Sequence, residues 1–391
     1  MSTGLDRAAA VAAIGSMLRR TRSTAQAVGD RFPLYADPAG GRWTTTRRGS
    51  WTGGFWGGLL WLAAEEYGDE AEDASGRAEA LQRARDVTVR LRERALDDTD
   101  TRGMTFWYGA AQGQLRCGDP TAARVAAEGA AALAAAAHPR YGVVPAGTAL
   151  GRGARGSAEL TVDSAAAVLA LLCWSGREHG HQDRVDLAQR HAAAVRDRCL
   201  AKDGGVRAGV HLDEATDEAP AGHWARGQAW GLLALTTAAA AERDFPVQDG
   251  GYLEAALLAA DHWLDRTGDA VPAWNFEEPD GLRDTSAAAI AAQALLELAD
   301  LTPGPRGRAL RDTATRLLGR LVSGHLTGTA GMPDGPPPGM LLDGCYDIAS
   351  GTAVAHELIW GDYFLLSALK RLAYEHPAPT NSPDARGKGP G

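Results

Sequence analysis

The feature that most constrains the fold is a series of alanine- and leucine-rich segments in which apolar residues recur with the 3.6-residue period of a helix. Runs that alternate Val, Ile and Thr with polar residues are nearly absent, which disfavours a strand-based fold. Capping residues and Gly or Pro stops divide the chain into helices. The predicted helices are 5–29, 53–68, 74–96, 104–117, 120–137, 160–178, 182–199, 225–243, 250–267, 284–301, 306–323 and 351–373.

Very alanine-rich segments alternate with more charged ones, such as 74–96 and 182–199. The inner helices of a double ring touch neighbours on both sides and tolerate few charges, whereas the outer helices show one face to water. The pattern therefore predicts an all-α fold in which six helical hairpins close into an (α/α)6 barrel. An open superhelix of hairpins would give a similar count, but no fixed sequence period supports it.

The connections between these helices are of two kinds, short turns and long loops rich in Gly, Pro and aromatic residues. Loops of that length in a compact domain are usually functional, and their alternation with short turns puts them at one end of a barrel, around a pocket. No long polar linker divides the chain, so we expect one domain over 1–376, followed by a disordered tail over 377–391. The long loops are 31–52, 139–159, 200–224, 268–283 and 324–350.

Composition excludes several classes of partner and cofactor. The net charge is −9 and no cluster of Lys and Arg alternates with aromatic residues, which argues against binding to nucleic acid. No apolar stretch approaches a membrane span and no signal peptide is visible, so we expect a cytoplasmic protein that does not contact a membrane. We expect it to be a monomer or homodimer. The four cysteines lack zinc-ligand spacing, and the common phosphate-loop, acyl-transfer and zinc-helix motifs are missing. We expect no metal and no cofactor.

Tryptophans and glycines gather where the second predicted helix begins, in the sequence WTGGFWGG over 51–58. Indole faces suit the C–H faces of sugar rings, and glycines allow close backbone approach. Trp51 and Trp56 are therefore candidate binding residues, with core packing as the alternative. His211 and Trp274, each in a long loop, are further candidates, and the alternatives are a surface histidine and a loop anchor.

A single carboxylate, Asp163, begins the otherwise apolar segment DSAAAVLALL. An aspartate that faces an apolar barrel interior has its charged form disfavoured, which raises its pKa and suits it to donate a proton. The alternative is an N-cap, in which the carboxylate accepts a backbone N–H.

A polar cluster opens the predicted helix 225–243, where the chain reads HWARGQAW over 223–230. Arg226 and Trp230 are four residues apart and share one helix face. A guanidinium beside an indole could hold a carboxylate and a sugar ring together, and Gln228 or His223 would complete the polar set. The alternative for Arg226 is a structural ion pair.

Taken in order, these motifs resemble the unsaturated glucuronyl and rhamnogalacturonyl hydrolases, glycoside hydrolase families 88 and 105. The resemblance spans almost the whole chain, and its RGQAW and WGDYF pieces are specific. The matching pieces are WTGGFWGGLLWLA (51–63), CGD (117–119), TVDSAAAVLALLCW (161–174), HWARGQAWGLLAL (223–235), VPAWNF (271–276), RDTSAAAIAAQALLEL (283–298) and IWGDYFLLSALKRL (359–372).

The resemblance implies a glycosidase that hydrates a vinyl ether instead of using the two-carboxylate displacement of ordinary glycosidases. An aspartate protonates C4 of a 4,5-unsaturated uronic acid, water adds at C5, and the hemiketal opens to release the partner sugar. Asp163 matches the family's general acid and base. His211, Arg226, Gln228 and Trp230 match residues of its pocket, which implies a small, anionic, sugar-like substrate.

The chain departs from the family around this pocket. The family carries an H-D-x-G-F motif whose aspartate is its second essential carboxylate, and ungapped spacing puts Thr101 at that place. Asp100, the preferred candidate, or Asp98 could reach the same space. The loop 139–159 has Tyr141 as its only aromatic residue where the family offers an aromatic plate, and the family's His-Gln-Gly before the polar cluster is absent.

Three hypotheses follow. The first is hydration of an unsaturated uronyl sugar, or a related unsaturated sugar, by Asp163. The second is a repurposed barrel that acts on a specialised metabolite as a hydratase, dehydratase or cyclase. The third is a non-catalytic carbohydrate-binding protein with an inactive site.

Overall fold

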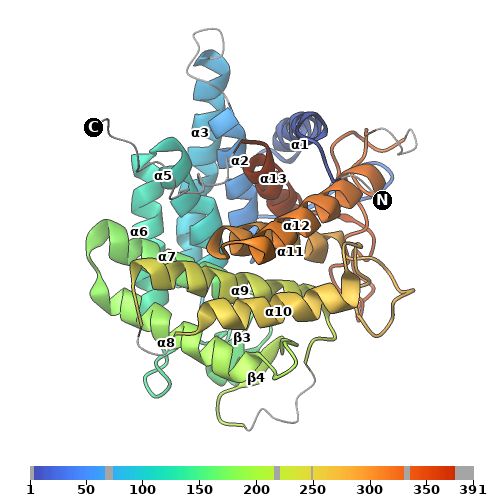
Figure 1. The fold of residues 1–391 in the computed structure, drawn as a ribbon. Coiled ribbons are helices and arrows are strands. Elements are labelled where there is room, and N and C mark those ends of the chain that lie inside the picture. The colour runs from blue at the N-terminus through green and yellow to red at the C-terminus, as the bar shows by residue number, and fades with distance from the viewer. Residues whose placement is uncertain (1–3, 67–73, 215–220, 248–249, 330–334, 375–391) are drawn as a thin grey trace, which may run out of the picture.

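The computed structural model describes residues 4–66, 74–214, 221–247, 250–329 and 335–374. Helices make up most of this part of the chain, and none of them is long and apolar enough to cross a membrane (Figure 1). The predicted tail 377–391 lies outside the described residues. The α-helices are α1 (Arg7–Val28), α2 (Gly53–Glu66), α3 (Ala74–Arg90), α4 (Arg102–Phe106), α5 (Gln112–Cys117), α6 (Pro120–Ala135), α7 (Ala165–His179), α8 (Gln182–Cys199), α9 (Ala225–Asp244), α10 (Tyr252–Thr267), α11 (Thr285–Leu301), α12 (Pro305–Gly324) and α13 (Ile359–Tyr374).

Each predicted helical segment contains a helix, and the differences lie mainly at the ends. The predicted helix 104–117 is α4 and α5 joined by a π-helical turn over Trp107–Ala111. The segment predicted to start at residue 160 becomes helical only at α7, because Glu159–Thr161 is a strand. The last helix starts at Ile359 instead of residue 351, after a loop with left-handed backbone at Gly351 and Ala353.

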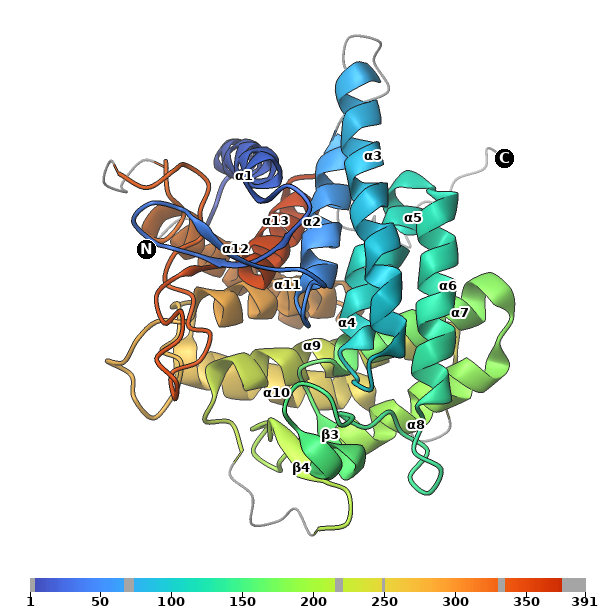
Figure 2. The same ribbon diagram turned by 180° about the vertical axis from the view of Figure 1, so that it is seen from behind.

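The helices form a closed double ring. The inner helices α2, α4 with α5, α7, α9, α11 and α13 each pack against the next, and α13 packs against α2. The outer helices α1, α3, α6, α8, α10 and α12 pack on the inner ones, as Figure 1 shows for α10 and α12 and Figure 2 shows from behind for α3 and α6. Contact between α13 and α2 closes the ring and excludes the open superhelix, so the predicted (α/α)6 barrel is confirmed.

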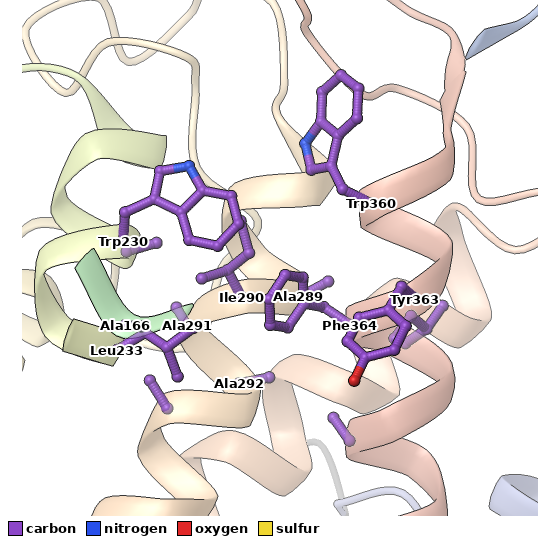
Figure 3. Close-up of a cluster of buried hydrophobic side chains, with 14 of the residues drawn as sticks. Ala166, Trp230, Leu233, Ala289, Ile290, Ala291, Ala292, Trp360, Tyr363 and Phe364 are labelled. Atoms are coloured by element: carbon purple, nitrogen blue, oxygen red, sulfur yellow. The ribbon is translucent and has the colours of Figure 1, made fainter. Parts of the chain in front are cut away.

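The inner helices approach closely because small side chains alternate with large aromatic ones. Figure 3 shows Trp230 of α9 and Phe364 of α13 beside Ala289 and Ile290 of α11, all of them buried. The two aromatic rings meet edge to face, with centroids 5.3 Å apart. A Cβ added at Gly54 in α2 would run into the carbonyl oxygen of the facing α4, so this contact requires glycine.

A small sheet and a buried ion pair join the first and last parts of the chain. Strand β1 (Phe32–Ala36) pairs antiparallel with β2 (Trp43–Thr46) and with β5 (Glu357–Leu358). Arg20 of α1 donates two hydrogen bonds to Glu357, with Nε–Oε1 at 2.9 Å and Nη2–Oε2 at 2.5 Å. Burial and the Glu357 charge hold the pKa of Asp362 well above its usual range, and the two carboxyls share a hydrogen bond.

A second sheet brings two of the long loops together. Strand β3 (Glu159–Thr161) pairs antiparallel with β4 (Gly209–His211). The loop 139–159 leads into β3, and β4 lies within the loop 200–224. Residues that follow β3 directly are thereby fixed at the start of the inner helix α7.

Candidate active site

An open pocket of about 410 Å³ lies where the long loops meet the starts of the inner helices. This volume suits a small organic ligand. Asp100 and Asp163 both line the pocket, and Arg152 is the cationic residue among the described residues that do so. The lining residues are Ser50, Trp51, Asp100, Thr101, Met104, Leu150, Gly151, Arg152, Thr161, Asp163 and Tyr346.

Asp163 lies between β3 and α7 and keeps a carboxyl without a hydrogen-bond partner among the described residues. The N-cap of α7 is Ser164, and no side chain caps that helix, so the alternative of an N-cap aspartate is not realised. Protein surrounds the Asp163 carboxyl except toward the pocket, and this burial raises its pKa to about 6. The charge of Arg226 lowers the pKa, and that of Asp100 raises it. A carboxyl with this pKa can give and take a proton near neutral pH.

Asp100 is buried beside Asp163 and receives two short hydrogen bonds. The hydroxyls of Thr161 and Ser164 both donate to the same carboxyl oxygen, each at 2.6 Å. Burial raises the pKa of Asp100, and the two hydroxyls partly offset that rise. Because Thr161 and Ser164 flank Asp163 in the sequence, one short segment positions both carboxyls.

Asp98, the other candidate for the second carboxylate, does not line the pocket. Its carboxylate accepts hydrogen bonds from the backbone N–H of Thr148 at 2.9 Å and from the Thr148 hydroxyl at 2.7 Å. These bonds lower the pKa of Asp98. Asp98 therefore anchors the loop 139–159, and Asp100 and Thr101 are the members of this segment that reach the pocket.

Trp51 and Tyr346 form an aromatic wall of the pocket. Their ring centroids are 6.1 Å apart, and the Trp51 indole N–H donates to the Tyr346 hydroxyl at 3.2 Å. Trp360 packs against Trp51 at 4.7 Å. Tyr346 comes from the long loop 324–350, and it was not singled out from the sequence. Its position as an aromatic residue in a loop predicted to border the pocket could have indicated it.

Arg226 opens α9 but is buried in a network instead of being free to bind an anion. Its Nη1 donates to the Asp284 carboxylate and to the Cys345 carbonyl oxygen, and its Nη2 donates to the Tyr346 carbonyl oxygen at 2.8 Å. The structural ion pair weighed for this residue is thus what the structure contains. Arg226 still acts on the pocket, because its charge lowers the pKa of Asp163.

Trp56, Gln228 and Trp230, three of the predicted binding residues, lie in the core instead of lining the pocket. The amide of Gln228 is fully buried, accepting from Val206 N–H at 2.8 Å and donating to the Gly204 carbonyl at 2.9 Å. Trp56 and Trp230 are 2% and 1% exposed. None of the three reaches the pocket in this structure, because α2 and α9 are inner helices whose opposite faces are both covered by other helices.

None of three further predicted binding residues lines the pocket: His211 ends strand β4, and His223 and Trp274 lie in loops. His211 Nδ1 lies 3.8 Å from a carboxylate oxygen of Glu214, and His223 Nδ1 lies 3.0 Å from one of Glu277. Trp274 is half-buried, and its carbonyl oxygen accepts a hydrogen bond from the N–H of Ala225, the first residue of α9, at 2.9 Å. Among the described residues, no group of three or more His, Cys, Asp or Glu is arranged to hold a metal ion.

A closed (α/α)6 barrel with two neighbouring carboxyls in the pocket at its mouth has the site of an acid–base catalyst. The chain is 30% identical over 382 residues to the unsaturated glucuronyl hydrolase of Bacillus sp. strain GL1, covering 92% of this chain and 96% of that protein. It is 27% identical to the unsaturated chondroitin disaccharide hydrolase of Streptococcus pyogenes serotype M1, covering 82% of this chain and 80% of the relative. No family model matches the chain.

The solved structure of the Bacillus sp. GL1 unsaturated glucuronyl hydrolase, described as responsible for the degradation of glycosaminoglycan, has the same fold. Its TM-score is 0.78 at 28% identity, over 93% of this chain and 96% of that one. The chain belongs to the unsaturated glucuronyl hydrolase family. It is therefore a glycoside hydrolase-like enzyme, and the resemblance noted in the sequence is confirmed.

Proposed function

We propose that this enzyme hydrates the vinyl ether of a 4,5-unsaturated uronyl sugar at the end of a small saccharide. The names of the relatives supply the substrate class, because they act on unsaturated glucuronyl and unsaturated chondroitin disaccharide substrates. One observation of this chain carries the proposal. Asp163 presents an unpaired carboxyl with a pKa of about 6 to a pocket of suitable size.

The proposed reaction begins with proton transfer from the Asp163 carboxyl to C4, which breaks the double bond and leaves positive charge shared by C5 and the ring oxygen. A water molecule adds its oxygen to C5 and returns a proton to Asp163. The product is a hemiketal that opens and releases the partner sugar. Asp163 is thus regenerated, and the net change is the addition of one water molecule.

Asp100 is proposed as the second carboxyl of the site. Its negative charge raises the pKa of Asp163 and would also stabilise the positive charge that develops on the sugar ring. The hydroxyls of Thr161 and Ser164 hold it in one orientation, which a catalytic carboxyl needs. Trp51 and Tyr346 are proposed to stack against the sugar.

The test is loss of the enol-ether absorbance when the purified protein is mixed with a panel of 4,5-unsaturated uronyl disaccharides. Asp163→Asn and Asp100→Asn remove the proposed catalytic carboxyls. Asp312→Asn is the matched control, since it makes the same chemical change at an exposed residue of the outer helix α12 that does not line the pocket.

We expect the wild type to consume at least one member of the panel. Asp163→Asn should abolish the decay, and Asp100→Asn should reduce kcat by about 100-fold or more. The control Asp312→Asn should keep most of the wild-type activity. No decay with the wild type on any member would overturn the proposal. Undiminished turnover by Asp163→Asn would remove Asp163 from the mechanism.

A further inference from the structure

The tip of the loop 139–159 presents Arg152 to the pocket through an unusual backbone. Leu150, Gly151 and Gly153 have φ values of 58°, 81° and 58°, all in the left-handed region. A leucine is held in this region only when its surroundings require it, so the loop is built to place its tip. Leu150, Gly151 and Arg152 all line the pocket.

Contacts on both sides of this tip fix its position. Asp98 accepts two hydrogen bonds from Thr148, and the N–H of Gly147 donates to the Gly156 carbonyl at 2.9 Å. Added Cβ atoms at Gly147 and Gly156 would collide with backbone atoms, so the loop is closely packed at its base. The loop therefore forms a fixed wall of the pocket.

Arg152 keeps donors available for a ligand. Its Nη1 donates to Glu159 at 2.8 Å, whereas its Nε and Nη2 donate to no described residue. Its side chain is 31% exposed. Arg226, by contrast, is 7% exposed at its side chain and donates to Asp284 and two carbonyl oxygens. An anion that enters the pocket thus meets Arg152 as its accessible guanidinium.

The charge of Arg152 also reaches the two carboxyls, because it lowers the pKa of Asp163 and of Asp100. In a 4,5-unsaturated uronate the carboxylate is attached to C5, next to the carbon that Asp163 would protonate. A substrate placed for that proton transfer brings its carboxylate among two acidic side chains, which is unfavourable without a nearby cation.

We propose that Arg152 binds the carboxylate of the unsaturated uronate and is a specificity-determining residue of this enzyme. The inference rests on the proposed function and names the residue through which the site recognises its substrate class. A sulfate ester on the neighbouring sugar has related chemistry, but it is farther from the bond that reacts. Because the charge of Arg152 acts on Asp163, which would protonate C4, we assign Arg152 to the uronate carboxylate attached to the neighbouring C5 and not to a sulfate.

The test compares Arg152→Gln, Arg152→Lys and the control Arg155→Gln on an unsulfated unsaturated uronyl disaccharide, its uronate methyl ester and a sulfated analogue. Arg155 lies in the same turn, its side chain is 66% exposed, and it does not line the pocket. Arg152→Gln should lower kcat/KM on the free acid by about 10- to 100-fold, mainly through a higher KM. Its effect on the methyl ester should be much smaller, and Arg152→Lys should recover part of the loss.

Equal losses on acid and ester would overturn the inference in favour of a structural role, and no loss on either would remove Arg152 from recognition. A loss confined to the sulfated analogue would overturn the assignment to the uronate. If the wild type turns over no unsaturated uronide, the proposed function fails and this inference fails with it. Wild-type turnover with an unaffected Arg152→Gln overturns this inference alone.

Discussion

Replacing Asp163 by asparagine is expected to stabilise the folded protein at neutral pH. Burial raises the pKa of this carboxyl from 3.8 to about 6. A shift of about two units corresponds to about 3 kcal/mol of folding free energy. Because the pKa of Asp163 is higher in the folded than in the unfolded protein, the folded state is most stable below the unfolded-state pKa, where the carboxyl is protonated in both states. This stability is lost as the pH rises through the folded-state pKa, where the buried carboxyl must become charged. Asparagine has no charge to bury, and the Asp163 carboxyl makes no hydrogen bond that the substitution would break among the described residues.

The assay is urea unfolding of the wild type and Asp163→Asn between about pH 4 and pH 8. The two proteins should have nearly equal free energies of unfolding at the acid end, and the variant should become more stable by about 3 kcal/mol at the upper end. Asp98→Asn should instead be less stable than the wild type at the upper end of this pH range. Hydrogen bonds from Thr148 lower the pKa of Asp98, so its charged form stabilises the fold. A pH-independent difference between wild type and Asp163→Asn would refute the reasoning.

Three further predictions follow from the same structure. The kcat/KM for vinyl-ether hydration should fall about tenfold per pH unit above the Asp163 pKa of about 6, as a pH–rate profile would show, because the proton donor is lost. Glu357→Gln should lower the free energy of unfolding by about 3–5 kcal/mol in urea, since it leaves the Arg20 charge buried without its ion-pair partner. Gly54→Ala should lower the melting temperature by forcing α2 away from α4, at a cost of about 1–3 kcal/mol, whereas Gly324→Ala has open space and should not.

The sequence predicted the barrel well because helical periodicity and the alternation of apolar and charged segments are local signals. It also singled out Asp163 as the one carboxylate at the start of an apolar run, although the predicted helix 160–178 included this residue and α7 begins only at Ala165. It could not separate pocket from core for Trp56, Gln228 and Trp230. Helix spacing tells which residues share a face, but in an inner ring every face is covered, and only the tertiary arrangement decides which position borders the opening.

The choice between Asp98 and Asp100 was likewise beyond the sequence, because it depends on the path of one loop. The sequence did not identify Arg152 as a pocket residue, because an arginine in a glycine-rich stretch is usually solvated. The left-handed backbone that places it at the pocket is a property of the folded loop. The sequence did predict that the loop 139–159 borders the pocket. Its length indicated this, and so did its lack of the aromatic residues that the family offers there.

The departures from the family pattern at 98–101 and in the loop 139–159 are physically linked. Asp98 anchors the loop that carries Arg152, while Asp100 is held by the hydroxyls on either side of Asp163. One short segment thus supports both the wall of the pocket and its second carboxyl. Thr101→Asp, which would put a carboxylate where ungapped spacing places the family motif's aspartate, would add a third acidic group beside two carboxyls whose pKa values burial already raises. The proposed site therefore rests on the position of Asp100 and of the loop together.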